Sequence, residues 1–164
     1  MISVKKCFFL AAFLFFFIFC SYLFGDTISI ATFDIRIFSN NSRDEEELLQ
    51  ICNILKEFDF ISIQEVRDTE VLDRAVLMLK NRFNLEYRYL ASEKVGTERV
   101  KEIYVYLYRA DRVKAIKSLG VYPDPEDDFI REPFIAMFKA GEFDFYVINI
   151  YSIYCDSVSE RRKR

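Results

Sequence analysis

A long apolar stretch near the amino terminus separates a leader from the part of the chain that can form a globular fold. Between Cys7 and Phe24 all but one of the 18 residues are apolar, and two lysines precede them. This arrangement is typical of an export signal, and its length is close to the ~18–20 residues that cross a bilayer as a helix. We therefore assign residues 1–25 to a signal peptide or an N-terminal membrane anchor. Residues 26–164 would then be secreted, periplasmic or held at a membrane by residues 7–24.

The 139 residues after the leader are enough for one domain with a core, but not for two. They carry 21 basic and 26 acidic residues, a formal net charge of −5. This balance excludes a strongly basic nucleic-acid binder, so phosphate chemistry would need a metal ion or a few well-placed arginines. The chain has no histidine. Outside the leader it has two cysteines, Cys52 and Cys155, and the sequence leaves open whether they pair.

The periodicity predicts two strand–helix units followed by a run of strands. Residues 27–35 and 60–66 have the β-branched and aromatic composition of buried strands. Ser42 and Glu45 form a capping-box pattern before the first helix, and Asp68 or Thr69 is expected to cap the second. Five further strands are expected at residues 85–91, 103–109, 113–119, 133–138 and 143–151. The pattern favours a mixed sheet in an α/β layered domain.

A sharply polar segment, Gln64-Glu65-Val66-Arg67-Asp68, ends the second strand. The carboxyl ends of strands are where α/β proteins usually build their sites. The carboxylate of Glu65 could hold a hard divalent cation such as Mg²⁺, and Arg67 could hold a phosphate through two hydrogen bonds. The alternative is a polar strand end that leads into a helix cap.

Other polar residues occur where they could face Glu65. Asp34 interrupts an apolar strand, and Glu102 and Arg131 stand just before later strands. Each has a simpler interpretation as a solvated strand end or a surface charge. Three tyrosines alternate along the strand that follows Glu102, where they could stack on nucleobases or line a half-buried sheet face: Tyr104, Tyr106 and Tyr108.

Together these segments resemble the deoxyribonuclease I branch of the endonuclease/exonuclease/phosphatase superfamily. The resemblance runs from about residue 28 to about residue 160. It is carried in order by Ala31-Thr32-Phe33-Asp34-Ile35-Arg36, Gln64-Glu65-Val66-Arg67-Asp68, Lys101-Glu102 with the aromatic strand that ends at Arg109, and Arg131-Glu132-Pro133. The pair Gln64-Glu65 resembles a motif of the superfamily in general. The segments Val66-Arg67-Asp68 and Arg131-Glu132-Pro133 resemble motifs of the DNA-cleaving branch.

The resemblance implies a four-layer α-β-β-α sandwich, of which this chain would hold mainly the first sheet with its helices. It also implies a divalent-metal-dependent endonuclease that hydrolyses DNA, with Mg²⁺ as the cofactor and Ca²⁺ or Mn²⁺ as alternatives. Glu65 would bind the metal, and Arg67 and Arg131 would contact DNA phosphates. Asp34 stands where the family has an asparagine near the phosphate. Glu102 would orient a catalytic histidine.

The chain departs from the family pattern in two ways. Tyr151 occupies the position of the first catalytic histidine, and a phenol with a pKa near 10 is a poor acid or base at neutral pH. The chain also ends at residue 164, whereas family members continue for about as much again, with further metal ligands and a second histidine. We therefore expect residues 26–164 to be a truncated, inactive domain, with one face of its first sheet uncovered. The alternative is a non-catalytic, membrane-anchored envelope protein that uses the exposed sheet to bind a protein partner.

Overall fold

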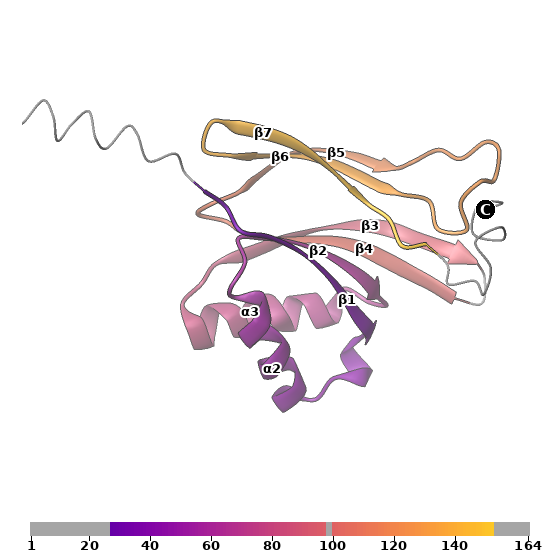
Figure 1. Cartoon of the computed structure of the whole chain (residues 1–164). Coiled ribbons are helices and arrows are strands. Elements are labelled where there is room, and N and C mark those ends of the chain that lie inside the picture. Colours follow the sequence, from indigo (N-terminus) through magenta and orange to yellow (C-terminus); the bar gives the residue numbers. More distant parts are fainter. Residues whose placement is uncertain (1–26, 98–99, 153–164) are drawn as a thin grey trace, which may run out of the picture.

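The computed structural model describes residues 27–97 and 100–152 (Figure 1). The expected leader at residues 1–25, the membrane contact of residues 7–24, Cys155 and the basic end of the chain lie outside the described residues. Within the described part, no helix is both long enough and apolar enough to span a membrane.

The first sheet has four strands in the order β1-β2-β4-β3. Strand β1 (Ile30–Phe38) pairs in parallel with β2 (Phe60–Val66), as expected for strands joined by a helical crossover. Strand β4 (Val100–Arg109) runs antiparallel to both β2 and β3 (Tyr87–Thr97). The sheet is therefore mixed, as the sequence predicts. Strand β1 begins and ends three residues later than expected, which places Asp34 at its centre.

Two helices cover one face of this sheet (Figure 1). A short 3-10 turn, η1 (Asn40–Ser42), precedes α2 (Glu45–Leu55), and α3 (Glu70–Phe83) follows β2. Their apolar sides pack on the sheet in one buried cluster, which includes Leu48, Cys52, Leu55, Leu72, Leu79, Ile61, Ile63 and Val105. This burial of Cys52 agrees with its place on the apolar stripe.

The predicted capping box of Ser42 and Glu45 is wrong. Ser42 belongs to the 3-10 turn, and its hydroxyl donates to the backbone carbonyl of Ile37. The N-cap of α2 is Asp44, whose carboxylate accepts a hydrogen bond from the backbone N–H of Glu47 at 2.8 Å. At α3 the N-cap position is Thr69, but the carboxylate of Asp68 supplies the capping contact.

A second sheet covers the other face of the first, so the expectation of an uncovered first sheet is wrong. Strands β5 (Lys114–Val121), β6 (Phe134–Ala140) and β7 (Phe143–Asn149) form an antiparallel sheet in the order β5-β6-β7. Alternation had predicted these strands but could not say that they pair apart from the first four. These three strands form a sheet of their own because β6 has large apolar side chains at alternate positions. Those side chains are buried against the large side chains on one face of β4.

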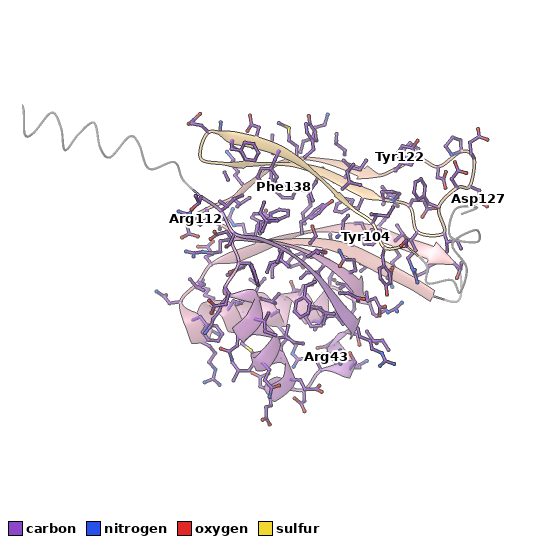
Figure 2. All side chains as sticks on the ribbon, in the orientation of Figure 1. Arg43, Tyr104, Arg112, Tyr122, Asp127 and Phe138 are labelled. Carbon is purple, nitrogen blue, oxygen red and sulfur yellow. The ribbon has the colours of Figure 1, made fainter. Side chains whose placement is uncertain are left out.

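Aromatic side chains fill the space between the sheets. Tyr104, Tyr106 and Tyr108 of β4 are buried there with Phe134 and Phe138 of β6. In Figure 2 the side chain of Phe138 lies between the two sheets. Base stacking by the three tyrosines is therefore excluded, because their rings are used in the core.

The molecule thus has a helical layer and two sheets, the layered α/β architecture that the sequence predicts. The outer face of the second sheet is open to solvent in the described residues. It exposes Tyr146 and Ile148 of β7, each by more than 60%.

Candidate functional site at the shared rim of two sheets

The polar residues singled out in the sequence meet where strand ends of the two sheets come together. The carboxyl ends of β1 and β2 lie beside the amino end of antiparallel β4. In the second sheet the start of β6 pairs with the end of β7, Phe134 opposite Asn149. This common edge, the rim site, contains Asp34, Glu65, Arg67, Glu102, Arg131 and Tyr151.

The first sheet is irregular at the rim site. The register of β1 with β2 shifts between Asp34 and Phe38, and that of β2 with β4 shifts between Ile63 and Val66. Within these breaks Ile37 and Glu65 have φ values of 51° and 59°, in the left-handed region that L-residues rarely adopt. Such conformations cluster at functional sites, where the surrounding structure maintains them.

Both oxygens of the Glu65 carboxylate accept hydrogen bonds. The Tyr151 hydroxyl donates to Oε1 at 2.9 Å, and the backbone N–H of Ile37 donates to Oε2 at 3.2 Å. Nη2 of Arg67 lies 3.9 Å from Oε2. Burial acts to raise the pKa of Glu65, but these hydrogen bonds and the charges of Arg67 and Arg131 together lower it. Glu65 is therefore ionised at neutral pH.

Glu102 is fully buried and forms an ion pair with Arg131. Nε of Arg131 lies 2.7 Å from Oε1 of Glu102, but not in the direction of a hydrogen bond. No group among the described residues donates a hydrogen bond to either Glu102 oxygen. Burial raises the pKa of Glu102, and the positive charge of Arg131 opposes this shift. Arg131 is itself largely buried, so its positive charge is balanced inside the protein by Glu102.

Tyr151 is fixed at three points. Its hydroxyl binds Glu65, its backbone N–H donates to the Tyr104 hydroxyl at 2.9 Å, and its ring lies 5.1 Å from the guanidinium carbon of Arg131. The hydrogen bond to Glu65, followed by burial and the nearby Asp34, raises the pKa of Tyr151 to about 12. Tyr151 is therefore a neutral hydrogen-bond donor across the physiological pH range.

Arg67 is the more accessible of the two rim arginines. Its Nη1 donates to the backbone carbonyl of Lys101 at 3.0 Å, and a quarter of its side chain is exposed. The sequence places Arg67 and Arg131 far apart, whereas the structure brings both guanidinium groups near Glu65. Two positive charges at one rim can hold an anion.

The sequence analysis missed Asn149, whose buried amide bonds to that of Gln64 beneath the rim site. Nε2 of Gln64 donates to Oδ1 of Asn149 at 2.6 Å, and Nδ2 of Asn149 donates to the backbone carbonyl of Ile63 at 3.1 Å. These bonds join β7 to β2 across the two sheets. The available signal was that Asn149 is polar at an inward position of an alternating strand, where Phe145 and Val147 are apolar.

The residues present do not fit a resident divalent cation as they stand. No group of three or more acidic, histidine or cysteine side chains is arranged to hold a metal ion in the part of the chain that the structure describes. Mg²⁺ can bind through one or two carboxylates and water, which Asp34 and Glu65 could supply. However, both oxygens of Glu65 already accept hydrogen bonds from protein groups.

Comparisons with known proteins identify the class of fold. The structure is similar to an endonuclease/exonuclease/phosphatase protein from Bacteroides vulgatus, with a TM-score of 0.57 and 20% identity over 76% of this chain and 52% of that one. It is also similar to D. rerio TDP2 in complex with a single-strand DNA product, with a TM-score of 0.52 and 18% identity over 82% and 49% of the two chains. The fold is that of the endonuclease/exonuclease/phosphatase proteins, as predicted.

Sequence similarity points to relatives that are named as deoxyribonucleases. The chain is 36% identical over 115 residues to deoxyribonuclease-1-like 2 of Mus musculus, covering 68% of this chain and 41% of the relative. It is 34% identical over 146 residues to deoxyribonuclease-1 of Rattus norvegicus, covering 82% and 51%. No protein-family model matches the chain. The chain is a homologue of the deoxyribonuclease I-like proteins and spans about half the length of the curated relatives it matches.

Proposed function

We propose that this chain provides the phosphate-recognition half of an exported, deoxyribonuclease I-like protein that acts on DNA, and that alone it has little or no hydrolytic activity. The homologues are named as deoxyribonucleases, which supports a nuclease-like role. The observation that carries the proposal is the rim site, where Arg67 and Arg131 meet three carboxylates at the end of two sheets.

The two arginines are the groups that would hold a DNA phosphate. Guanidinium groups stay charged at all relevant pH values and match the geometry of phosphate oxygens. The whole chain has a formal net charge of −3, so its attraction for DNA must come from a local site rather than from the overall charge. Asp34 and Glu65 would repel a phosphate that approached without a counter-charge, which makes the arginines necessary for binding.

The described groups of the rim site are poorly matched to hydrolysis. Tyr151 is a neutral phenol, Glu65 is an ionised acceptor, and Glu102 is paired with Arg131. A general base or acid works best with a pKa near the working pH. The family relation suggests dependence on a divalent metal, Mg²⁺ with Ca²⁺ or Mn²⁺ as alternatives, but the described residues do not fit such an ion. We therefore assign this chain binding rather than bond cleavage.

Plasmid nicking tests the lack of hydrolysis. The purified full chain is incubated with supercoiled plasmid and Mg²⁺, Mn²⁺ or Ca²⁺, and Glu65→Ala is the matched variant. The expected result is no nicking above the level of Glu65→Ala. Metal-dependent nicking that Glu65→Ala abolishes would show that the chain is an active nuclease by itself.

DNA binding tests the role of the arginines. Arg67→Ala is expected to weaken binding to a labelled duplex by about tenfold, because one charged hydrogen-bonding contact to phosphate is lost. Fluorescence anisotropy at low salt gives the dissociation constants. The control is Arg88→Ala, which removes an exposed β3 arginine that pairs with Glu86. Equal losses in the two variants would mean that DNA binds through general charge and not at the rim site.

A protein-binding role in the cell envelope is the second candidate. The exposed side chains of Tyr146 and Ile148 on the outer face of the second sheet favour it, because exposed apolar side chains of this kind often mark interaction surfaces. This candidate predicts a partner in envelope extract that binds without DNA or metal and is lost in Tyr146→Ser/Ile148→Ser. Retention of all binding in that variant would exclude this face.

A further inference from the structure

The hydroxyl of Tyr151 lies against the carboxylate of Glu65, the group that would bind a cation at the rim site. It donates to Oε1 of Glu65 at 2.9 Å, and the backbone N–H of Ile37 donates to Oε2 at 3.2 Å. Asp34 lies near enough to the same hydroxyl to contribute to its raised pKa. A phenol has a single proton to donate. That proton therefore lies among two carboxylates where a divalent ion would otherwise balance their charge.

Tyr151 is held in this position by more than its hydroxyl. Its backbone N–H is anchored to the hydroxyl of Tyr104, and Tyr104 is fully buried between the sheets. Its ring packs against the guanidinium group of Arg131, which in turn is paired with Glu102. Withdrawal of the Tyr151 hydroxyl from Glu65 would disturb these contacts, so the closed arrangement is built into the packing of the two sheets.

We propose that Tyr151 closes Glu65 to divalent cations, so that the rim site of this chain meets anions through Arg67 and Arg131 without a metal ion. Hard divalent cations bind carboxylates through the oxygens themselves, at about 2.0–2.6 Å. An ion at Oε1 of Glu65 would compete with the Tyr151 hydroxyl for the electron pairs of that oxygen. The inference goes beyond the proposed function, because it concerns the cation and holds whether or not DNA is the ligand.

Mn²⁺ titration of the purified full chain, followed by electron paramagnetic resonance, tests the inference. Tyr151→Phe keeps the ring but removes the donor, and it is expected to bind Mn²⁺ at least about tenfold more tightly than the unaltered chain. Tyr151→Phe/Glu65→Gln is expected to lose the gain. Tyr146→Phe, an exposed tyrosine on the outer face of the second sheet, is the matched control and is expected to behave like the unaltered chain.

Two outcomes would overturn the inference. One is that the unaltered chain binds Mn²⁺ as tightly as Tyr151→Phe, and the other is that Tyr151→Phe/Glu65→Gln keeps the gain. Far-ultraviolet circular dichroism of Tyr151→Phe, compared with the unaltered chain, guards against loss of folding in the phenylalanine variant. A failure of DNA binding leaves both results unaffected, so the two proposals fail separately.

Discussion

Tyr151 and Glu65 show how one hydrogen bond sets the electrostatics of a site. The phenol of Tyr151 donates to Glu65, whereas Glu102 is paired with Arg131. The same hydrogen bond raises the pKa of Tyr151 and helps to lower that of Glu65. The pair is thus a fixed donor and a fixed acceptor rather than an acid and a base.

This pair predicts a change in the pH dependence of stability. Because the pKa of Glu65 is lowered in the folded state, its contribution to the free energy of unfolding is present above its ordinary pKa of 4.5 and is lost as the pH falls through the folded value. Tyr151→Phe removes one cause of the lowering and is expected to lose about 1–2 kcal/mol of stability at pH 6 but less at pH 3. Urea unfolding at the two pH values measures the difference. A loss of equal size at both values would contradict the assignment, and Tyr146→Phe is the control.

At the level of elements, Asn149 joins β7 to the first sheet. Its side chain donates to the backbone carbonyl of Ile63 and accepts from Gln64, and all three residues are buried. Buried polar groups that lose a partner are costly, because they retain no contact with water. The two amides therefore fix the position of the second sheet on the first. They do so directly beneath the rim site, since Gln64 precedes Glu65 in β2.

Asn149→Ala is expected to destabilise the protein by about 2–3 kcal/mol, because it removes the buried acceptor of Gln64 and the side-chain donor to the Ile63 carbonyl, and leaves Gln64 only its contact with Thr32. Thermal or urea unfolding measures the change. The control is Asn53→Ala on the exposed side of α2, where the side chain bonds only to a carbonyl of its own helix. Similar effects of the two substitutions would mean that Asn149 does not link the sheets.

The elements themselves were largely predictable from the sequence, but their partners were not. Strand β2 begins and ends at the predicted residues, because it is apolar on both sides and ends in a sharp polar segment. The second sheet was missed because alternation shows that a strand has one apolar face but not which face covers it. The proximity of Glu65 and Glu102 followed from strand ends in one sheet, whereas Asp34 lies at the centre of β1, just before the break in its register with β2. The contact of Tyr151 with Glu65 did not, because it depends on how the two sheets pack.

For the molecule as a whole, the outer face of the second sheet is the surface most prone to association. In the variant Tyr146→Ser/Ile148→Ser, each substitution is expected to change the free energy of unfolding by less than about 0.5 kcal/mol, because both side chains are exposed. The variant is also expected to reduce self-association, because it removes apolar surface. Urea unfolding and light scattering at increasing concentration measure the two effects. Ile61→Ser, inside the helix-covered core, is the contrasting variant and is expected to unfold the protein. Unchanged scattering in the double variant would show that association uses another surface.

Because the rim site is divided between two sheets, the site persists only while the two sheets stay packed on each other. Asp34, Glu65 and Glu102 belong to the helix-backed sheet, whereas Arg131 and Tyr151 come from the chain that leads into and out of the other. If the second sheet detaches in a local opening, the helix-backed layer can keep its own core while the anion loses one arginine and the acidic cluster loses its hydrogen-bond donor. Ligand recognition would then disappear at denaturant concentrations that leave the helices folded.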